Sequence, residues 1–160
     1  MSTTITPFLW FTHQAEEAAN FYCSVFKNSK VTQVTHAAAD NPSNKKGEVM
    51  TVAFKLDGNP FVALNGGKQG WDFNESVSFV INCETQKDVD HYWEKLTSGG
   101  GKESQCGWCK DKYGVSWQVV PAGLADVLGD KDPARAQRAV QAMLKMKKLD
   151  LEAMKRAANG

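Results

Sequence analysis

The feature that most constrains the fold is an internal repeat, in which one order of predicted elements occurs twice along the chain. Each copy has a strand, then an amphipathic helix, and then further strands joined by turns. The second copy is displaced by roughly 70 residues, so that Phe21-Tyr22 in the first helix corresponds to Tyr92-Trp93 in the second. A repeat this long is not a solenoid period and instead predicts two βαβββ modules that share one core.

The first copy covers roughly residues 5–66. It opens on the apolar run Phe8–Phe11, which suits a buried strand, and continues as a helix with alanines, Tyr22 and Phe26 near one face. The strands predicted after this helix are Lys30–Ala39, Val49–Leu56 and Phe61–Leu64. A turn at Asp57–Pro60 joins the last two as a hairpin, which completes one module.

The second copy covers roughly residues 75–122. It begins with a strand around Val77–Ile81, and a helix follows whose start is marked by a capping box of Thr85 and Asp88. The glycines at Gly99–Gly101 end that helix. The remaining strands are predicted over Gly101–Lys110 and Val115–Val120, on either side of a turn at Asp111–Gly114.

The 160 residues fit one compact domain of the α+β class. Residues 1–122 are expected to hold the paired modules, and residues 123–160 a helical appendage in which Asp132 caps and Pro133 opens a helix. The methionine-rich face around Met143 must cover either the domain itself or a second subunit. A ferredoxin-like sandwich is the competing topology, but it leaves the extra hairpin strands without a place.

Charge and composition exclude several classes of partner. The net charge of +1 gives no field that selects nucleic acid or an acidic membrane. Residues 131–160 carry eight Lys or Arg against three Asp or Glu, for which a solvated helix face is favoured over contact with phosphates. No apolar run approaches the roughly 20 residues that span a bilayer, and Met1–Thr6 lacks the features of a signal peptide. Four cysteines in such a chain indicate free thiols and a cytoplasmic location.

Several separate motifs occur in one order along the chain. They are Asn65-Gly66-Gly67, the segment Phe73–Phe79, Gln105-Cys106-Gly107-Trp108 and the segment Asp111–Pro121. With these motifs the chain resembles the PhnB-like branch of the glyoxalase, bleomycin-resistance and dioxygenase superfamily, also called the vicinal oxygen chelate superfamily. That branch is often labelled a demethylubiquinone 3-methyltransferase domain. The resemblance covers nearly the whole chain and implies a U-shaped sheet whose cupped face holds a ligand.

The same resemblance implies where a metal would bind. Metal-using members place one His or Glu on each of four strands, and the matching positions here are Pro7, Ala63 (or Asn65), Ser76 and Gln118. Proline and alanine offer no ligand through their side chains, while serine and glutamine are neutral oxygen donors that hold transition metals poorly. We therefore expect no metal and no other cofactor, and the usual glyoxalase or dioxygenase chemistry is not favoured.

Other candidate motifs favour structural interpretations. Cys106 and Cys109 have redox spacing but lie in a strand or bend rather than at a helix N-terminus, so two structural thiols are predicted. The three histidines at 13, 36 and 91 do not converge on one site, although His13 lies near one end of the predicted cup. Neither glycine cluster sits between a parallel strand and a helix N-terminus, so the methyltransferase label gains no support from a cofactor loop.

Strand alternation predicts which side chains line the cup. If Pro7 and Gln118 face the cup, then Ser116 and Val120 face it as well. The alternate residues Phe8, Trp10, Trp117 and Val119 then pack under the helices. The predicted ligand-binding lining is Leu9, Phe11, Phe61, Ala63, Asn65, Phe73, Ser76, Ser78, Trp108 and Gln118. This set suits a small, flat or apolar molecule held by a few hydrogen bonds. The alternative is that these residues only fill a core.

The functional expectation is a metal-free small-molecule binding protein that forms a homodimer, with no nucleic acid or membrane partner. The alternative is an enzyme of the same superfamily, a lyase, a dioxygenase or the methyltransferase of the label, that acts on an unknown small molecule. A purely structural interaction domain is a third possibility, based on the helical appendage. No catalytic residue is predicted. Gln118 is expected to form a hydrogen bond with Ser76, Asn65, water or ligand, because an unpaired buried amide is costly.

Overall fold

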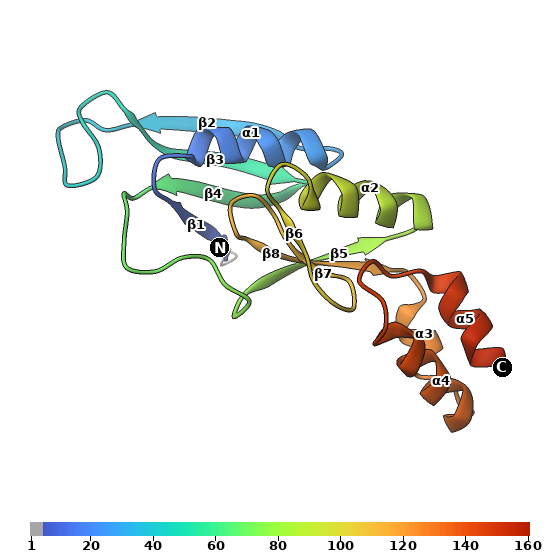
Figure 1. Cartoon of the computed structure of the whole chain (residues 1–160). Helices are drawn as coiled ribbons and strands as arrows, with labels where there is room; N and C mark the ends of the chain where they lie inside the picture. The colour runs from blue at the N-terminus through green and yellow to red at the C-terminus, as the bar shows by residue number, and fades with distance from the viewer. Residues whose placement is uncertain (1–4) are drawn as a thin grey trace. The chain divides into compact units, whose positions relative to one another are not determined.

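Each copy of the predicted repeat forms its own four-stranded sheet with a helix packed against it (Figure 1). The computed structural model describes residues 5–160, which divide into two units, residues 5–71 and Asp72–Gly160. Residues 1–4, on which the expectation about a signal peptide partly rests, lie outside the described residues. The predicted pair of βαβββ modules is therefore confirmed, and the ferredoxin-like alternative is wrong.

In the first unit the strand order is β1-β4-β3-β2. Its elements are β1 (Phe8–Phe11), α1 (Ala15–Val25), β2 (Lys30–His36), β3 (Val49–Leu56) and β4 (Asn59–Asn65). Strand β1 runs parallel to β4, whereas β3 is antiparallel to both of its neighbours. The turn at Asp57 and Gly58 has positive φ at both residues, 45° and 80°, which matches the tight hairpin predicted between β3 and β4.

Alanines bring α1 close to this sheet. Ala15, Ala18 and Ala19 are fully buried, because small side chains let the helix backbone approach the strands. Tyr22 of α1 stacks on Phe54 of β3 with ring centroids 6.1 Å apart, within the range of roughly 4.5–7 Å usual for aromatic pairs. Phe54 in turn stacks on Phe61 of β4 at 5.6 Å. These rings identify the face of the first sheet that α1 covers.

In the second unit the strand order is β5-β8-β7-β6, which repeats the topology of the first. Its elements are β5 (Ser78–Cys83), α2 (Gln86–Thr97), β6 (Lys102–Glu103), β7 (Trp108–Lys110) and β8 (Ser116–Pro121). The predicted capping box is confirmed, since the side chain of Thr85 accepts from the Asp88 backbone N–H and Asp88 accepts from that of Thr85. Val89, Trp93 and Leu96 then form the buried face of α2.

A buried aspartate fixes the hairpin between β7 and β8. Asp111 accepts from the backbone N–H groups of Tyr113 and Val115, at 2.9 and 3.1 Å. Its second carboxylate oxygen accepts from the indole N–H of Trp117 at 2.9 Å. The turn predicted from Asp111 to Gly114 is therefore present, and these bonds set which residues of β7 lie opposite β8.

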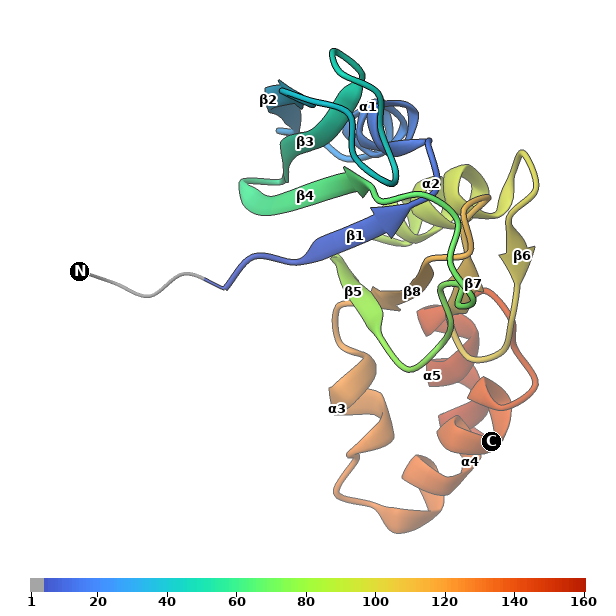
Figure 2. The same cartoon turned by 90° about the vertical axis from the view of Figure 1, so that its left-hand side faces the viewer.

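The C-terminal region forms α3 (Leu124–Leu128), α4 (Pro133–Met143) and α5 (Leu151–Asn159) within the second unit (Figure 2). Asp132 caps α4 and Pro133 opens it, as predicted. The segment before α5 is tied to the turn between β6 and β7, because Cys106 N–H donates to the Met146 carbonyl at 2.9 Å and Gly107 N–H to that of Lys147 at 2.7 Å. The appendage thus supports the turn that precedes Trp108.

None of the helices in residues 5–160 has both the length and the apolar character that a bilayer crossing requires.

Candidate functional site

The second sheet has one face covered by α2 and an opposite face, called here the open face. Trp117 and Val119 of β8 are buried on the α2 side, so the alternate residues Ser116, Gln118 and Val120 belong to the open face. This agrees with the faces predicted for β8. Strand pairing adds side chains from neighbouring strands, since Ser78 lies opposite Ser116 and Trp108 opposite Gln118.

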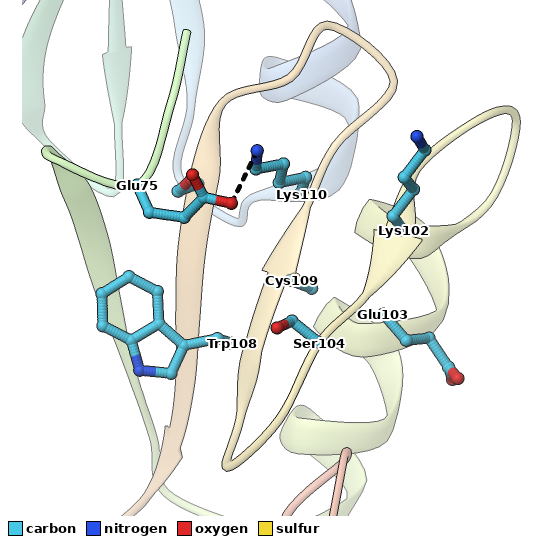
Figure 3. A pocket seen from close by; sticks show the side chains of 8 residues that line it. Glu75, Lys102, Glu103, Ser104, Trp108, Cys109 and Lys110 are labelled. Carbon is cyan, nitrogen blue, oxygen red and sulfur yellow. Dashed lines mark ion pairs between the residues drawn. The ribbon is translucent and has the colours of Figure 1, made fainter.

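A hollow of about 440 Å³ lies at the β6-β7 end of this sheet (Figure 3). Its lining residues are Glu75, Lys102, Glu103, Ser104, Trp108, Cys109, Lys110 and Ser116. Figure 3 shows Trp108 and Lys110 leaving β7 toward Glu75, whereas Glu103 points away from them. Of the predicted lining residues, all of which lie within the described residues 5–160, Trp108 alone is among the residues that line this hollow.

The charges of the hollow are partly paired. The Lys110 ammonium lies 2.7 Å from the Glu75 carboxylate, and its hydrogen bond holds the pKa of that carboxyl below its ordinary value. Glu103 accepts from the Trp93 indole N–H at 2.9 Å and from Lys147 at 3.3 Å, and these bonds likewise lower its pKa. Among residues 5–160, the side chain of Lys102 takes part in no ion pair or hydrogen bond.

Ser116 is the most informative residue of the hollow. Its side chain is 1% exposed, and its Oγ is the one buried side-chain nitrogen or oxygen without a hydrogen-bond partner in the described part of the chain. Leaving a buried hydroxyl unsatisfied costs about 1–3 kcal/mol. A group that entered the hollow and bonded to this hydroxyl would remove that cost.

Gln118 forms a hydrogen bond within the predicted lining. Its Nε2 donates to Ser78 Oγ at 2.9 Å, so the partner is Ser78 and not Ser76 or Asn65. Ser76 lies on the turn before β5, where it is exposed and its backbone N–H donates to Asn74. Phe73 also precedes β5 and lies near Gly114, where an added Cβ would be 3.8 Å from the Phe73 Cβ. Ser78, Trp108 and Gln118 therefore share the open face, while Phe73 and Ser76 lie outside the strands.

The structure corrects the faces predicted for the first sheet. The five predicted lining residues from this copy, Leu9, Phe11, Phe61, Ala63 and Asn65, lie on the face that α1 covers. Their alternates Phe8 and Trp10 are 57% and 39% exposed instead of packing under a helix. The error arose because the run Phe8–Phe11 is apolar on both faces, so alternation of polarity does not reveal which face the helix covers.

Asn65 has a structural role on that face. Its Oδ1 accepts from the Ala15 backbone N–H at 2.8 Å, which caps α1 in place of Gln14, whose side chain forms no cap bond. Its Nδ2 donates to the Val49 carbonyl at 2.9 Å, and its own carbonyl accepts from Asn44 Nδ2 at 2.8 Å. Both ends of the Asn65 amide are thus used by the first unit itself.

A second hollow of about 460 Å³ lies beside Asn65 in the first unit. Its lining residues are His13, Glu16, Asn44, Glu48, Val49 and Asn65. In residues 5–160, no three His, Cys, Asp or Glu side chains lie close enough to hold one metal ion. The acidic residues around His13 therefore form no metal centre by this geometry.

The two cysteines with redox spacing occupy different environments. Cys106 lies in the turn with a φ of 55°, and its thiol lies 3.6 Å from the Met143 carbonyl. Cys109 is buried on the α2 side, where burial and then Asp111 and Glu103 raise the pKa of its thiol to about 12. A thiol with so high a pKa is a poor nucleophile at neutral pH, and all four cysteines are free.

Reasoning from the sequence missed most of the residues that line the hollow, including the charged residues Glu75, Lys102 and Lys110. A usable signal existed for one of them. The turn from Asp111 to Gly114 fixes the hairpin register and places Lys110 opposite Ser116, which was already assigned to the open face. Glu75 and Lys102 lie outside that hairpin, so only the folded structure brings them to it.

Comparison with known proteins gives both a family and a fold. The family model described as 3-demethylubiquinone-9 3-methyltransferase matches residues 3–120. The putative 3-demethylubiquinone-9 3-methyltransferase, PhnB protein, from Bacillus cereus is 33% identical, with a TM-score of 0.68, over 75% of this chain and 100% of that one. No curated protein matches the chain.

Two more distant structures show the fold alone. Protein PA1353 from Pseudomonas aeruginosa is 19% identical, with a TM-score of 0.61, over 75% of this chain and 98% of that chain. The fosfomycin resistance protein FosX from Listeria monocytogenes, in a structure complexed with Mn(II) and sulfate, is 12% identical with a TM-score of 0.53. That match covers 81% of this chain and 97% of FosX.

Proposed function

We propose that this chain, which belongs to the family described as 3-demethylubiquinone-9 3-methyltransferase in the vicinal oxygen chelate superfamily, binds a small organic molecule on the open face of its second sheet. The observation that carries the proposal is the buried, unpartnered hydroxyl of Ser116 in the wall of the hollow. A ligand atom bonded to this hydroxyl would satisfy it.

The remaining lining supports the same interpretation. Trp108 offers an aromatic ring to a flat or apolar group, and Lys110 and Ser104 add polar contacts near it. The hollow measures about 440 Å³, within the range of roughly 300–1,000 Å³ usual for small-molecule pockets. Trp108 is the large aromatic surface in a lining whose other members are mostly charged or polar, which suits a flat ligand that also carries polar groups.

The proposed site uses no metal ion. Two of the positions that metal-using relatives reserve for ligands, Ser76 and Gln118, carry neutral side chains in the second unit. The Gln118 amide is already bonded to Ser78, at 2.9 Å. In the first unit Ala63 offers no side-chain ligand and Asn65 caps α1. These residues do not fit a divalent ion at the superfamily positions.

Binding is favoured over methyl transfer for a similar reason. A methyl-donor or dinucleotide cofactor is commonly held by a glycine-rich loop between a parallel strand and a helix N-terminus. Gly66 and Gly67 follow β4, and Gly99 to Gly101 follow the end of α2. Neither cluster has the required place in the fold.

The proposal is tested by a fragment screen on the full chain, read from ¹H–¹⁵N correlation spectra. We expect flat fragments to shift the Trp108 indole signal and the backbone signals of Ser116 and Gln118. Trp108→Ala should abolish these shifts, whereas Trp71→Ala, which removes an exposed tryptophan of the first unit, should preserve them. The proposal fails if fragments shift only signals elsewhere, or if no fragment shifts the Trp108 group.

A further inference from the structure

The open face carries a row of polar side chains that crosses all four strands of the second sheet. Lys110 lies opposite Lys102 on β6 and opposite Ser116 on β8, and Ser116 lies opposite Ser78 on β5. Neighbouring strands are about 4.8 Å apart, so side chains in one row can contact the same small group. The row therefore presents two ammonium groups beside two hydroxyl groups.

The positive charge of this row is only partly compensated. Glu75 pairs with Lys110 at 2.7 Å, while the side chain of Lys102 has no partner in residues 5–160. The other acid of the hollow, Glu103, points away and is engaged by Trp93 and Lys147 (Figure 3). Like charges opposite one another on adjacent strands are unfavourable unless an anion lies near them.

The chemistry of the row selects a ligand class. We infer, on the basis of the proposed function, that the ligand carries a carboxylate that binds Lys110, Lys102 and Ser116, and that Glu75 occupies this place in its absence. A carboxylate accepts hydrogen bonds from ammonium and hydroxyl groups alike, so one group satisfies both lysines and the buried Ser116 hydroxyl. A cationic or neutral ligand group would leave Lys102 uncompensated.

Glu75 is suited to being replaced. It lies on the turn before β5, its side chain is 63% exposed, and Lys110 is its ion-pair partner. Exposed ion pairs contribute little to stability, so a second carboxylate can take the place of Glu75 without disturbing the sheet. Glu75 is thus an internal competitor of the ligand.

The position of Trp108 defines the rest of the ligand. Trp108 precedes Lys110 by two residues on β7, so both side chains lie on the open face about 6–7 Å apart along the strand. A planar aromatic group attached directly to the carboxylate spans this separation and can stack on the indole. The ligand class is therefore an aromatic or similarly flat carboxylic acid.

A matched pair of probes tests the inference on the full chain. We would titrate 2-naphthoate and its neutral counterpart 2-naphthamide and follow the Trp108 indole signal. Glu75→Gln should tighten 2-naphthoate binding several-fold, and Lys110→Met should weaken it at least about tenfold, the loss expected for one charge-assisted hydrogen bond. Neither variant should change the affinity for 2-naphthamide.

The controls come from an equivalent ion pair in the first unit. Asp40 and Lys45 form an exposed pair at 3.6 Å, so Asp40→Asn and Lys45→Met make the same changes of charge away from the hollow. They should leave both affinities unchanged. Correlation spectra of every variant verify that it is folded before its affinity is compared.

The outcomes separate the inference from the proposed function. Equal binding of acid and amide at Trp108 overturns the carboxylate inference and keeps the ligand site. Binding of 2-naphthoate that is insensitive to both Glu75→Gln and Lys110→Met overturns the assignment of its carboxylate to Lys110. If neither probe shifts Trp108 at millimolar concentration, the ligand class is wrong, and the fragment screen decides independently whether the hollow binds anything.

Discussion

Asn65 connects three segments of the first unit, and replacing it by alanine removes two hydrogen bonds of its side chain. The Asn65→Ala variant leaves the Ala15 N–H without its cap and the Val49 carbonyl without its donor. Loss of a helix cap costs about 1 kcal/mol, and an unsatisfied buried group costs about 1–3 kcal/mol. We therefore expect the free energy of unfolding to fall by about 2–4 kcal/mol.

The assay is urea unfolding followed by tryptophan fluorescence, with Asn59→Ala as the matched control. Asn59 lies at the other end of β4, is exposed, and donates at 3.2 Å to the Leu56 carbonyl in a surface turn. Its replacement should cost less than about 0.5 kcal/mol. If Asn65→Ala proves no more destabilising than Asn59→Ala, Asn65 does not hold α1 to the sheet and its reassignment from pocket to structure is wrong.

Four further predictions concern the second unit and the whole chain. Gly107→Ala should lower the free energy of unfolding by about 1–3 kcal/mol and shift the Trp108 signal. At a φ of 83°, a Cβ on residue 107 would lie 2.8 Å from the Val119 carbonyl oxygen and 2.9 Å from Leu149. The control Gly70→Ala, with open space around it, should have neither effect. Iodoacetamide at pH 8 should spare Cys83 and Cys109, whose thiol pKa values burial raises to about 11 and 12, so that the reactive thiolate forms only at higher pH; peptide mass spectrometry showing early modification of Cys109 would contradict this. The full chain should be a homodimer by light scattering, and deletion of residues 131–160, which removes the buried Leu149, should lower stability or change the subunit number; a monomeric full chain, or a deletion with neither effect, would oppose this role. Elemental analysis of protein purified without chelators should find no stoichiometric metal in the wild type. The Gln118→Glu variant should not bind a metal tightly either, because Pro7 and Ala63 still offer no ligands. About one Zn, Mn, Fe or Ni per chain in either protein would show that the metal positions are misplaced.

The fold could be predicted from the sequence because the signals of each element were local. The Thr85-Asp88 capping box, the Asp132-Pro133 helix start and the Asp111 turn each specify a boundary through chemistry within a few residues. The segment Gly101–Lys110 was predicted as one strand, but it forms β6 and β7 around a turn with positive φ at Cys106 and Gly107. That turn is stabilised by carbonyl groups of Met146 and Lys147, far along the chain, so the local sequence did not reveal it.

The candidate site was predictable only where the two faces of a strand differ in polarity. In β8 the sequence Ser116-Trp117-Gln118-Val119 alternates between polar and apolar residues, and its faces were assigned correctly. In β1 every residue is apolar, and the assignment was reversed. The charged part of the hollow depends on strand register and on the turn at Glu75, which tertiary structure determines.

The most direct test of the ligand site is the pattern of intermolecular nuclear Overhauser effects from the fragment that shifts Trp108 most strongly. We predict contacts between that fragment and both the Trp108 indole and the β protons of Ser116. Contacts to Leu9, Phe11 and Ala63, without any to Trp108 or Ser116, would contradict it.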